Sequence, residues 1–252
     1  MDPPVTDKLN ESKFYYEQGL THWRAGNIDL ALSCFDECVT IGHPYFKAAA
    51  LVSLGNLLGS IGDRENQLAY LRKIASLPDE QSKFVPRLVM GRTLTTLGEY
   101  DRAADAYQRA LQMNSAEPAL VLNLAELELM RQRYDSAEEL LSRVDGSGDP
   151  KVVLMSSALG VMLGALRRRD REIIAPFKKL LAVLRAHGLP MDFRWDFTDV
   201  SPTLARITQP KTSAIISRLV GVLSRKMDVQ DFLHQFPQLI GERQNLERRV
   251  QV

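Results

Sequence analysis

The side chains able to carry acid–base, nucleophilic or metal chemistry are few and scattered in this chain. The histidines are His22, His43, His187 and His234. None of them forms a sequence pattern with a nucleophile or a second metal ligand. Cys34 and Cys38 are four residues apart on an expected helix, where a disulfide is geometrically awkward, and no other cysteine or histidine pair completes a zinc pattern. We therefore expect two buried free thiols, no metal site and no cofactor.

A group of carboxylates lies in the aromatic stretch LPMDFRWDFTDVSP, where Asp192, Asp196 and Asp199 could converge. Two converging carboxylates can act as general acid and base. In a segment so rich in aromatic residues we expect these side chains instead to cap turns or to meet nearby arginines. The chain also has no glycine-rich phosphate loop. The sequence thus predicts a protein that is not an enzyme, with a site assembled by folding from dispersed residues as the remaining alternative.

The elements that must position these residues follow a repeat. Gly19, Gly55 and Gly91 stand 36 residues apart, and Ala125 and Gly160 follow at intervals of 34 and 35. Such small residues allow two antiparallel helices to approach closely, while larger residues fill the remaining volume. Helix pairs that recur in this way stack on one another, bury a continuous core and leave a concave surface open. The usual work of such an array is to hold another molecule.

The first unit carries Tyr15, Gly19, Ala31 and Phe35 at the places where a tetratricopeptide unit has an aromatic, a glycine, a small residue and an aromatic. The segment GEYDRAADAYQRAL is also close to the second-helix consensus of that family. Residues 12 to about 151 therefore resemble the tetratricopeptide repeat family. The resemblance implies an all-α fold, a right-handed superhelical solenoid of antiparallel helix pairs. It implies a function in protein–protein interaction.

The array is expected to change character after its fourth unit. A degenerate fifth unit is expected around Gly160, and Pro176 in its second half predicts that the second helix starts late, with the proline in its first turn. Residues 189–252 do not repeat. We expect a repeat array over residues 1–188, and a helical C-terminal extension over 189–252 that begins with an aromatic loop and caps the open end of the solenoid.

The resemblance also implies which residues line the concave groove, because the first helix of each unit faces it in this family. The expected partner-binding residues are Lys13, Tyr16, Trp23, Asn56, Arg92, Thr95 and Glu126. Family members that clamp a C-terminal carboxylate use asparagines and basic residues at such places in three consecutive units. Asn56 and Arg92 match that pattern, whereas Tyr16, Leu20 and Leu88 depart from it. A mainly apolar groove with two polar donors favours a partner helix or an extended peptide.

Charge is distributed unevenly along the chain. Residues 1–150 hold 15 Lys and Arg against 22 Asp and Glu, a net charge of −7, and residues 151–252 hold 17 against 9, a net charge of +8. The densest basic patch is Arg167, Arg168, Arg169 and Arg171. Such asymmetry is compatible with an anionic partner or with head-to-tail association of copies. The near-neutral total charge disfavours nucleic acid, which stays a distant alternative.

Composition places the chain among globular proteins, with 45% apolar and 25% charged residues. No apolar run approaches the length of a membrane span, and the start MDPPVTDKLN lacks the order of a signal peptide, so we expect a cytoplasmic protein without membrane contact. The function predicted from these patterns is an adaptor or scaffold that binds a partner protein in its groove. The alternative is a regulatory subunit that binds an effector enzyme through its C-terminal region.

Overall fold

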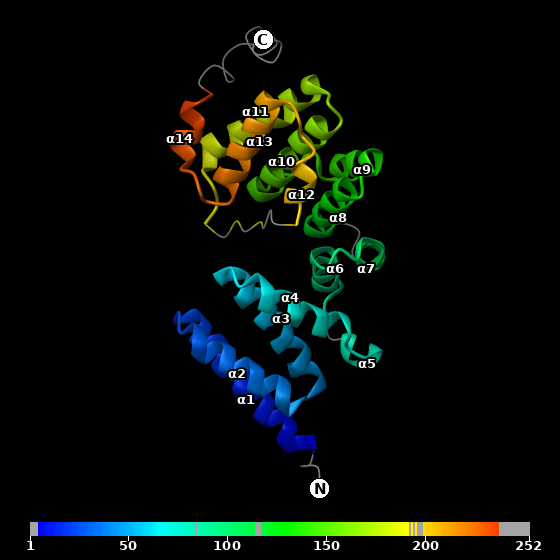
Figure 1. Cartoon of the computed structure of the whole chain (residues 1–252), viewed down its shortest axis with the longest axis vertical. Helices are drawn as coiled ribbons and strands as arrows, with labels where there is room; N and C mark the ends of the chain where they lie inside the picture. The colour runs from blue at the N-terminus through cyan, green and yellow to red at the C-terminus, as the bar shows by residue number, and fades with distance from the viewer. Residues whose placement is uncertain are drawn as a thin grey trace. The chain divides into compact units, whose positions relative to one another are not determined.

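A computed structural model describes the chain at residues 5–83, 85–113, 117–191, 193, 195 and 199–236, with side chains from residue 7 onward. Every regular element in these ranges is a helix, as the sequence predicts (Figure 1). The chain divides into two compact units, residues 1–110 (unit 1) and residues 111–252 (unit 2), and each is described on its own. The division at residue 188 expected from the end of the repeats stays a prediction.

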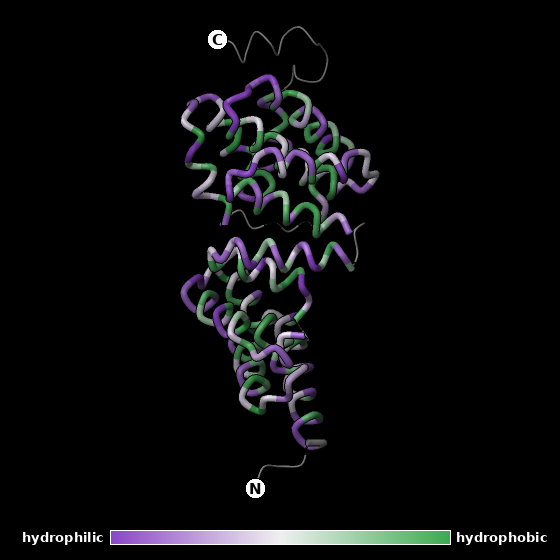
Figure 2. Tube along the Cα trace, turned by 90° about the vertical axis from the view of Figure 1, so that its right-hand side faces the viewer, coloured by the Kyte–Doolittle hydropathy of each residue, from purple (hydrophilic) through white to green (hydrophobic). Residues whose placement is uncertain are grey.

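Unit 1 is built from antiparallel helix pairs (Figure 1). Its helices are α1 (Val5–Arg24), α2 (Ile28–Ile41), α3 (Pro44–Ile61), α4 (Arg64–Ala75), the short α5 (Asp79–Ser82), α6 (Arg87–Thr96) and α7 (Tyr100–Met113), which runs on past the unit boundary. Helix α1 packs against α2, α3 packs against α4, and α2 packs against α3. Hydrophilic and hydrophobic residues alternate along these helices (Figure 2). Each helix can therefore turn an apolar face toward its neighbours.

The turns inside the first three pairs have the geometry that their glycines predict. Gly26, Gly62 and Gly98 adopt φ values of 78°, 80° and 78°. This left-handed region is costly for residues with a Cβ and is the usual way to end a helix. Glycine at these three places therefore allows each first helix to end in a tight turn.

The glycines of the first helices are in close contact with the second helices, at one fixed interval. A Cβ built on Gly19 would lie 2.6 Å from Cε1 of Phe35, and one built on Gly55 would lie 3.0 Å from Cδ2 of Leu71. In each case the partner lies 16 residues farther along the chain. The missing side chain is therefore what allows each pair of helices to approach closely.

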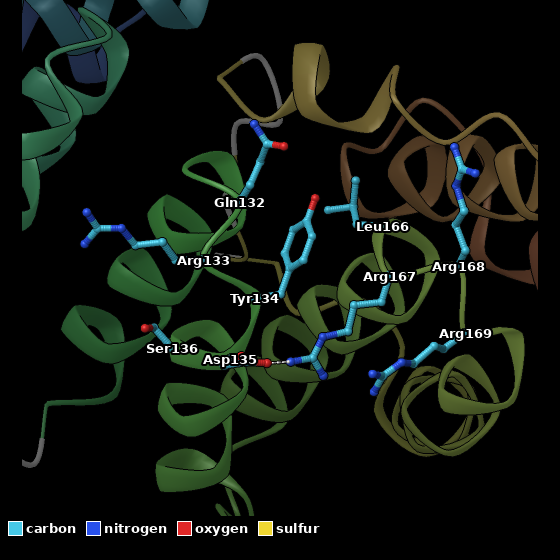
Figure 3. Close-up of a pocket in the computed structure, with 9 residues that line it drawn as sticks. All are labelled: Gln132, Arg133, Tyr134, Asp135, Ser136, Leu166, Arg167, Arg168 and Arg169. Atoms are coloured by element: carbon cyan, nitrogen blue, oxygen red, sulfur yellow. Dashed lines mark hydrogen bonds and ion pairs between the residues drawn. The ribbon is translucent and has the colours of Figure 1, made fainter.

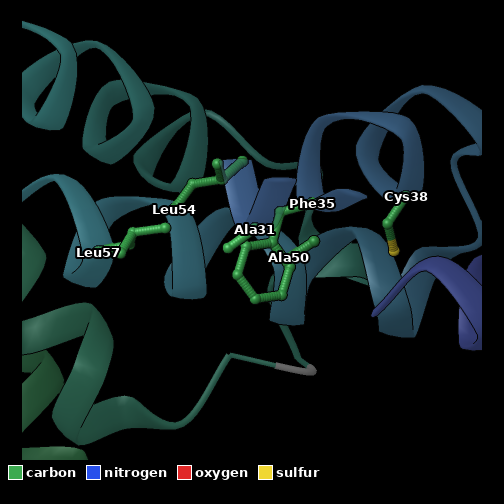
Figure 4. Close-up of a cluster of buried hydrophobic side chains, with 6 residues drawn as sticks. All are labelled: Ala31, Phe35, Cys38, Ala50, Leu54 and Leu57. Atoms are coloured by element: carbon green, nitrogen blue, oxygen red, sulfur yellow. The ribbon is translucent and has the colours of Figure 1, made fainter. Parts of the chain in front are cut away.

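The close approach of these helices produces a tightly packed core in the first two pairs (Figure 4). It consists of Ala31, Phe35, Cys38, Ala50, Leu54 and Leu57, all fully buried. The first three come from α2 at intervals of four and three residues, which places them on one helical stripe. The other three come from α3, so this core joins the second helix of one unit to the first helix of the next.

Unit 2 continues the pattern with two further pairs and then departs from it. Its helices are α8 (Pro118–Met130), α9 (Tyr134–Val144), α10 (Pro150–Leu166), α11 (Asp170–His187), α12 (Ser201–Leu204), α13 (Pro210–Leu223) and α14 (Val229–His234). Helix α8 packs against α9, α10 packs against α11, and α9 also packs against α10. Pro118 and Pro150 stand at the first helical position, where the missing N–H costs nothing.

The expected late start of the second helix in the fifth pair is wrong. Helix α11 begins at Asp170, and Pro176 lies inside it. A proline in a helix interior costs about 3 kcal/mol, since it removes one hydrogen bond and crowds the preceding turn. Here Pro176 stands 16 residues after Gly160, and a Cβ built on that glycine would lie 3.1 Å from Cβ of Pro176. Pro176 thus packs closely against Gly160, and the fifth pair keeps the 16-residue spacing of the others.

The C-terminal helices of unit 2 pack back onto the last pair. Helix α13 contacts α10, and α14 contacts α11. Phe232 of α14 lies edge-on to Phe177 of α11, with ring centroids 6.2 Å apart. Asp228 caps α14, because its side chain accepts a hydrogen bond from the Gln230 N–H at 2.7 Å. In the part of the chain that the structure describes, no helix has both the length and the apolar character that a bilayer crossing requires.

Candidate functional site

The surface expected to bind a partner can be followed from pair to pair by one position. We call the first-helix face the side of α1, α3, α6, α8 and α10 marked by the residue directly after the small residue. This residue is Leu20, Asn56, Arg92, Glu126 and Val161 in the successive pairs. Because the register is the same in each pair, these positions are equivalent, and their exposure can be compared.

Of the residues in α1 that were expected to bind a partner, the two aromatic ones pack partly against the core. Lys13 is exposed and lies 3.9 Å from the Glu17 carboxylate, one helical turn away. Tyr16 is half-buried, with its ring 5.8 Å from that of Phe35. Trp23 is half-buried and lies edge-on to the same ring at 6.3 Å. The aromatic residues thus extend the core outward and keep part of their surface accessible.

In the next two pairs the face carries exposed polar groups. Asn56 of α3 and Arg92 of α6 are both exposed, and their side chains form no hydrogen bond or ion pair with the described residues. Val52 and Leu88, four residues before them, are half-buried. Thr95 differs, since it is buried and its hydroxyl donates to the Gly91 carbonyl at 2.9 Å. Unit 1 therefore presents apolar surface beside two hydrogen-bond donors.

The same face is covered in unit 2. Glu126 is only 9% exposed, and Val161 at the equivalent place of α10 is fully buried. Leu122 and Leu129, on the same side of α8 as Glu126, are buried as well. Helix α8 is buried along nearly its whole length, including both glutamates near its end. Thr95 and Glu126 were expected to contact a partner, and the structure places both away from open solvent.

The aromatic segment after α11 provides part of this cover. The Trp195 indole N–H donates to Oε1 of Glu126 at 2.9 Å, across 69 residues of sequence. Phe193 is buried, and the carbonyl of Pro190 at the start of the segment accepts a hydrogen bond from the Arg225 guanidinium at 2.6 Å. The aromatic loop thus packs onto unit 2 through Phe193 and Trp195. Phe197 lies outside the described residues.

A second feature of unit 2 is an open hollow of about 630 Å³ between two helix turns, which we call the turn hollow (Figure 3). One side is formed by the turn between α8 and α9, and the other by the turn between α10 and α11. Its lining consists of Gln132, Arg133, Tyr134, Asp135, Ser136, Leu166, Arg167, Arg168 and Arg169. It therefore contains most of the basic patch expected from the sequence.

Arg167 is bound within the fold and does not form part of a free patch. Its side chain is 8% exposed and pairs with Asp135 and, at 2.7 Å, with Glu138 of α9. Burial lowers the pKa of this guanidinium, but the hydrogen bond that it donates to Glu138 and the carboxylate charges of Glu138, Asp135 and Glu172 outweigh it, so the pKa is raised overall. Arg167 thus stays charged and ties α9 to the turn before α11.

The other arginines of the expected patch lie at the surface. Arg169 is exposed and pairs with Glu172 at 2.9 Å. Arg168 and Arg171 are exposed, and neither side chain forms an ion pair or a hydrogen bond with the described residues. In the view of Figure 3, Arg167 extends toward Asp135, whereas Arg168 extends away from it. The patch is thus divided into a buried, neutralised part and an exposed part.

Two lining residues of the turn hollow adopt an unusual backbone. Gln132 and Arg168 have φ values of 62° and 56°, and they stand where the first three pairs have Gly26, Gly62 and Gly98. A residue with a Cβ in this region costs about 1 kcal/mol or more. The sequence shows that glycine is missing here, but only the structure shows that the left-handed turn is kept.

The remaining candidate residues provide little for catalysis. Cys38 is buried, its thiol donates to the Ser12 carbonyl at 3.3 Å, and burial raises its pKa to about 12, so it is not a nucleophile at neutral pH. Cys34 is only half-buried, because it lies at the edge of the stripe that Phe35 and Cys38 form, so the expectation of two buried thiols is wrong for it.

No three histidine, cysteine, aspartate or glutamate side chains among the described residues are arranged to hold a metal ion. Asp192 and Asp196, two of the carboxylates that could converge, lie outside the residues that the structure describes.

Comparison with known proteins matches two stretches of the chain to one repeat family. Residues 12–41 and residues 94–150 each match a model of the tetratricopeptide repeat. No curated protein matches the chain. A solved structure from Pseudomonas aeruginosa, titled "Functional Characterization of Pseudomonas Aeruginosa pilF", is 15% identical over 73% of this chain and 96% of its own, with a TM-score of 0.35. Similarity at this level supports no conclusion about function.

The two matched stretches contain the first pair and much of the third and fourth. The second and fifth pairs lie outside them but keep the same spacing of 16 residues between the small residue and its partner. Repeats of this kind are generally modules of protein–protein interaction and are typically not catalytic. The chain thus contains tetratricopeptide repeats.

Proposed function

We propose that this protein is a non-catalytic adaptor that binds a peptide or a helix of another protein on the first-helix face of unit 1. One observation carries the proposal. The position after the small residue is exposed in the second and third pairs, as Asn56 and Arg92, and buried in the fourth and fifth, as Glu126 and Val161. A partner could reach the face in unit 1, whereas in unit 2 the chain itself covers it.

The chemistry of the exposed face suggests the kind of ligand. Half-buried apolar side chains such as Trp23, Val52 and Leu88 can still bury surface against a partner, which is the main source of affinity in such contacts. Asn56 can donate to and accept from a peptide amide, and Arg92 can hold a carboxylate with two parallel hydrogen bonds. We therefore expect a ligand with an apolar stretch and an acidic group.

The cytoplasmic location expected from the sequence is part of this proposal. Cys34 and Cys38 are free thiols. Free thiols are the usual state of cysteine in reducing compartments.

The test compares capture of partner proteins by the intact protein and by an Asn56→Ala/Arg92→Ala variant, with mass spectrometry of what is bound. Both substitutions lie on exposed helical positions, so the variant is expected to fold, and circular dichroism checks this. Arg109→Ala is the matched control, because it removes an exposed arginine from the second helix α7. Partners held by the intact protein and by the control, but lost from the double variant, are the expected result.

The alternative function, a regulatory subunit that acts through its C-terminal region, has its own test. Removal of residues 189–252 would uncover the apolar surface of α8 and α10, so it cannot separate binding from folding. Arg218→Glu/Lys226→Glu instead alters exposed residues of the C-terminal region. If the partner is lost from this variant and retained by Asn56→Ala/Arg92→Ala, the regulatory reading replaces the adaptor.

A further inference from the structure

At the two turns that form the turn hollow, residues other than glycine occupy the left-handed position. In the first three pairs the left-handed position is Gly26, Gly62 or Gly98, whereas around the hollow it is Gln132 and Arg168. Strained residues of this kind are found preferentially where the side chain has a function. Both side chains line the same hollow, together with Tyr134. Of the three described non-glycine residues with positive φ, two therefore line one concave surface, and the third, Arg225, follows α13.

The charges around the hollow leave arginine side chains accessible. Arg167 is neutralised by Asp135 and Glu138. Arg133 is exposed and has only a distant contact with Glu128, at 3.9 Å. Arg168 forms no side-chain contact of this kind with the described residues. In the view of Figure 3 the ends of Gln132, Tyr134 and Arg168 extend toward the same side of the hollow. A guanidinium, a phenol and an amide there offer donors to a carboxylate.

We propose that the turn hollow binds an acidic peptide segment, with Arg168 as the residue that pairs with a carboxylate of the peptide. A guanidinium presents a planar fork of donors that matches a carboxylate. Tyr134 and Leu166 form the less polar part of the lining, against which the peptide backbone can lie. This site is in unit 2 and is separate from the first-helix face of unit 1, so it does not depend on the adaptor proposal.

The surroundings favour a peptide over a nucleic acid. The carboxylates of Asp135, Glu138 and Glu172 lie beside the arginines, and they would repel a backbone that carries a charge on every residue. A peptide can space its carboxylates to avoid them. Of the residues that line the hollow, Tyr134 alone is aromatic, whereas proteins that bind single strands usually offer several stacking platforms.

The experiment measures fluorescence anisotropy of a labelled decapeptide of alternating glutamate and glycine, with the lysine counterpart as the charge control. Arg168→Gly is the decisive variant. It removes the guanidinium and places at this turn the residue that the first three pairs use, so we expect the unfolding midpoint to be unchanged or higher. We expect this variant to bind the glutamate peptide at least about fivefold more weakly than the intact protein. The lysine peptide is expected not to bind.

Three controls decide between the outcomes. Arg171→Gln removes an exposed arginine of the following helix α11 that does not line the hollow, and we expect less than a twofold change. An equal loss in both variants, or no binding by the intact protein, would overturn the proposal. If labelled oligothymidine binds more tightly than the peptide, and this binding depends on Arg168, the ligand of the hollow is nucleic acid and not a peptide. The Asn56→Ala/Arg92→Ala variant should bind the peptide normally, and loss of binding there would move the acidic site to unit 1.

Discussion

Replacement of Gly91 by alanine tests whether the small residues set the distance between paired helices. A Cβ built on Gly91 would have three atoms of the Tyr107 ring within 2.7 Å. Tyr107 is 1% exposed, so its ring cannot move into solvent. Overpacking of this kind costs about 1–3 kcal/mol, and the three contacts place it at the upper end. Alanine recovers about 1 kcal/mol as the better helix former. We expect a net loss of about 2 kcal/mol of unfolding free energy.

Gly55→Ala is the matched control, because it makes the same chemical change at the same place of the second pair. There a Cβ would meet Cδ2 of Leu71 at 3.0 Å, and the next atom lies at 3.8 Å. The end of a leucine side chain can yield by a few tenths of an ångström. We therefore expect a change close to zero, since the helix-propensity gain offsets the remaining crowding.

The assay is urea unfolding followed by circular dichroism, with tryptophan fluorescence as a second probe that reports Trp23 of unit 1 and Trp195 of unit 2. Combination of Gly91→Ala with Tyr107→Leu should restore part of the lost stability, because the second pair shows that leucine fits at this place. Equal losses for Gly91→Ala and Gly55→Ala, or no rescue by Tyr107→Leu, would refute the argument that side-chain contact across the pair sets its spacing.

Two further predictions concern buried groups. Trp195→Phe keeps an aromatic ring but removes the indole donor to Glu126, so we expect a loss of about 1–2 kcal/mol in urea unfolding, and a loss below the fitting error would show that the contact is not formed in solution. Burial raises the pKa of the Cys38 thiol from 9.0 to about 12. The folded state therefore holds this proton more tightly, and its contribution to stability is complete below pH 9 and decreases as the pH rises toward 12. At about pH 8, alkylation with mass spectrometry should modify Cys34 well before Cys38, and equal rates would contradict the burial of Cys38.

The sequence predicts the fold well where one residue type has one physical use. Gly19, Gly55 and Gly91 indicate the places of close approach, and Gly26, Gly62 and Gly98 indicate the turns, because in each case a Cβ would be costly. The position of Pro176 is harder to predict, because the cost of a proline in a helix is local, whereas its close contact is with Gly160 in another helix. The sequence pattern shows the cost of a proline inside a helix, but it does not show the contact that this proline makes with another helix.

The candidate sites are harder to predict because exposure depends on distant parts of the chain. The family pattern assigns Asn56, Arg92 and Glu126 to equivalent places, and nothing local to Glu126 shows that Trp195 donates to it from 69 residues away. A weaker signal was present in α8 and α10, since PALVLNLAELELM and PKVVLMSSALGVMLGAL are apolar on nearly all sides. A helix of that kind is normally covered all round.

The contact between Trp195 and Glu126 has a consequence for competition between ligands. The covering segment is part of the same chain, so its effective concentration at α8 is that of a tethered ligand, of the order of millimolar or more for a short connection. A free partner at micromolar concentration would have to bind far more tightly than this segment to displace it. The first-helix face of unit 2 is thus already occupied by the chain's own segment, and a new ligand of this face is expected to bind mainly in unit 1.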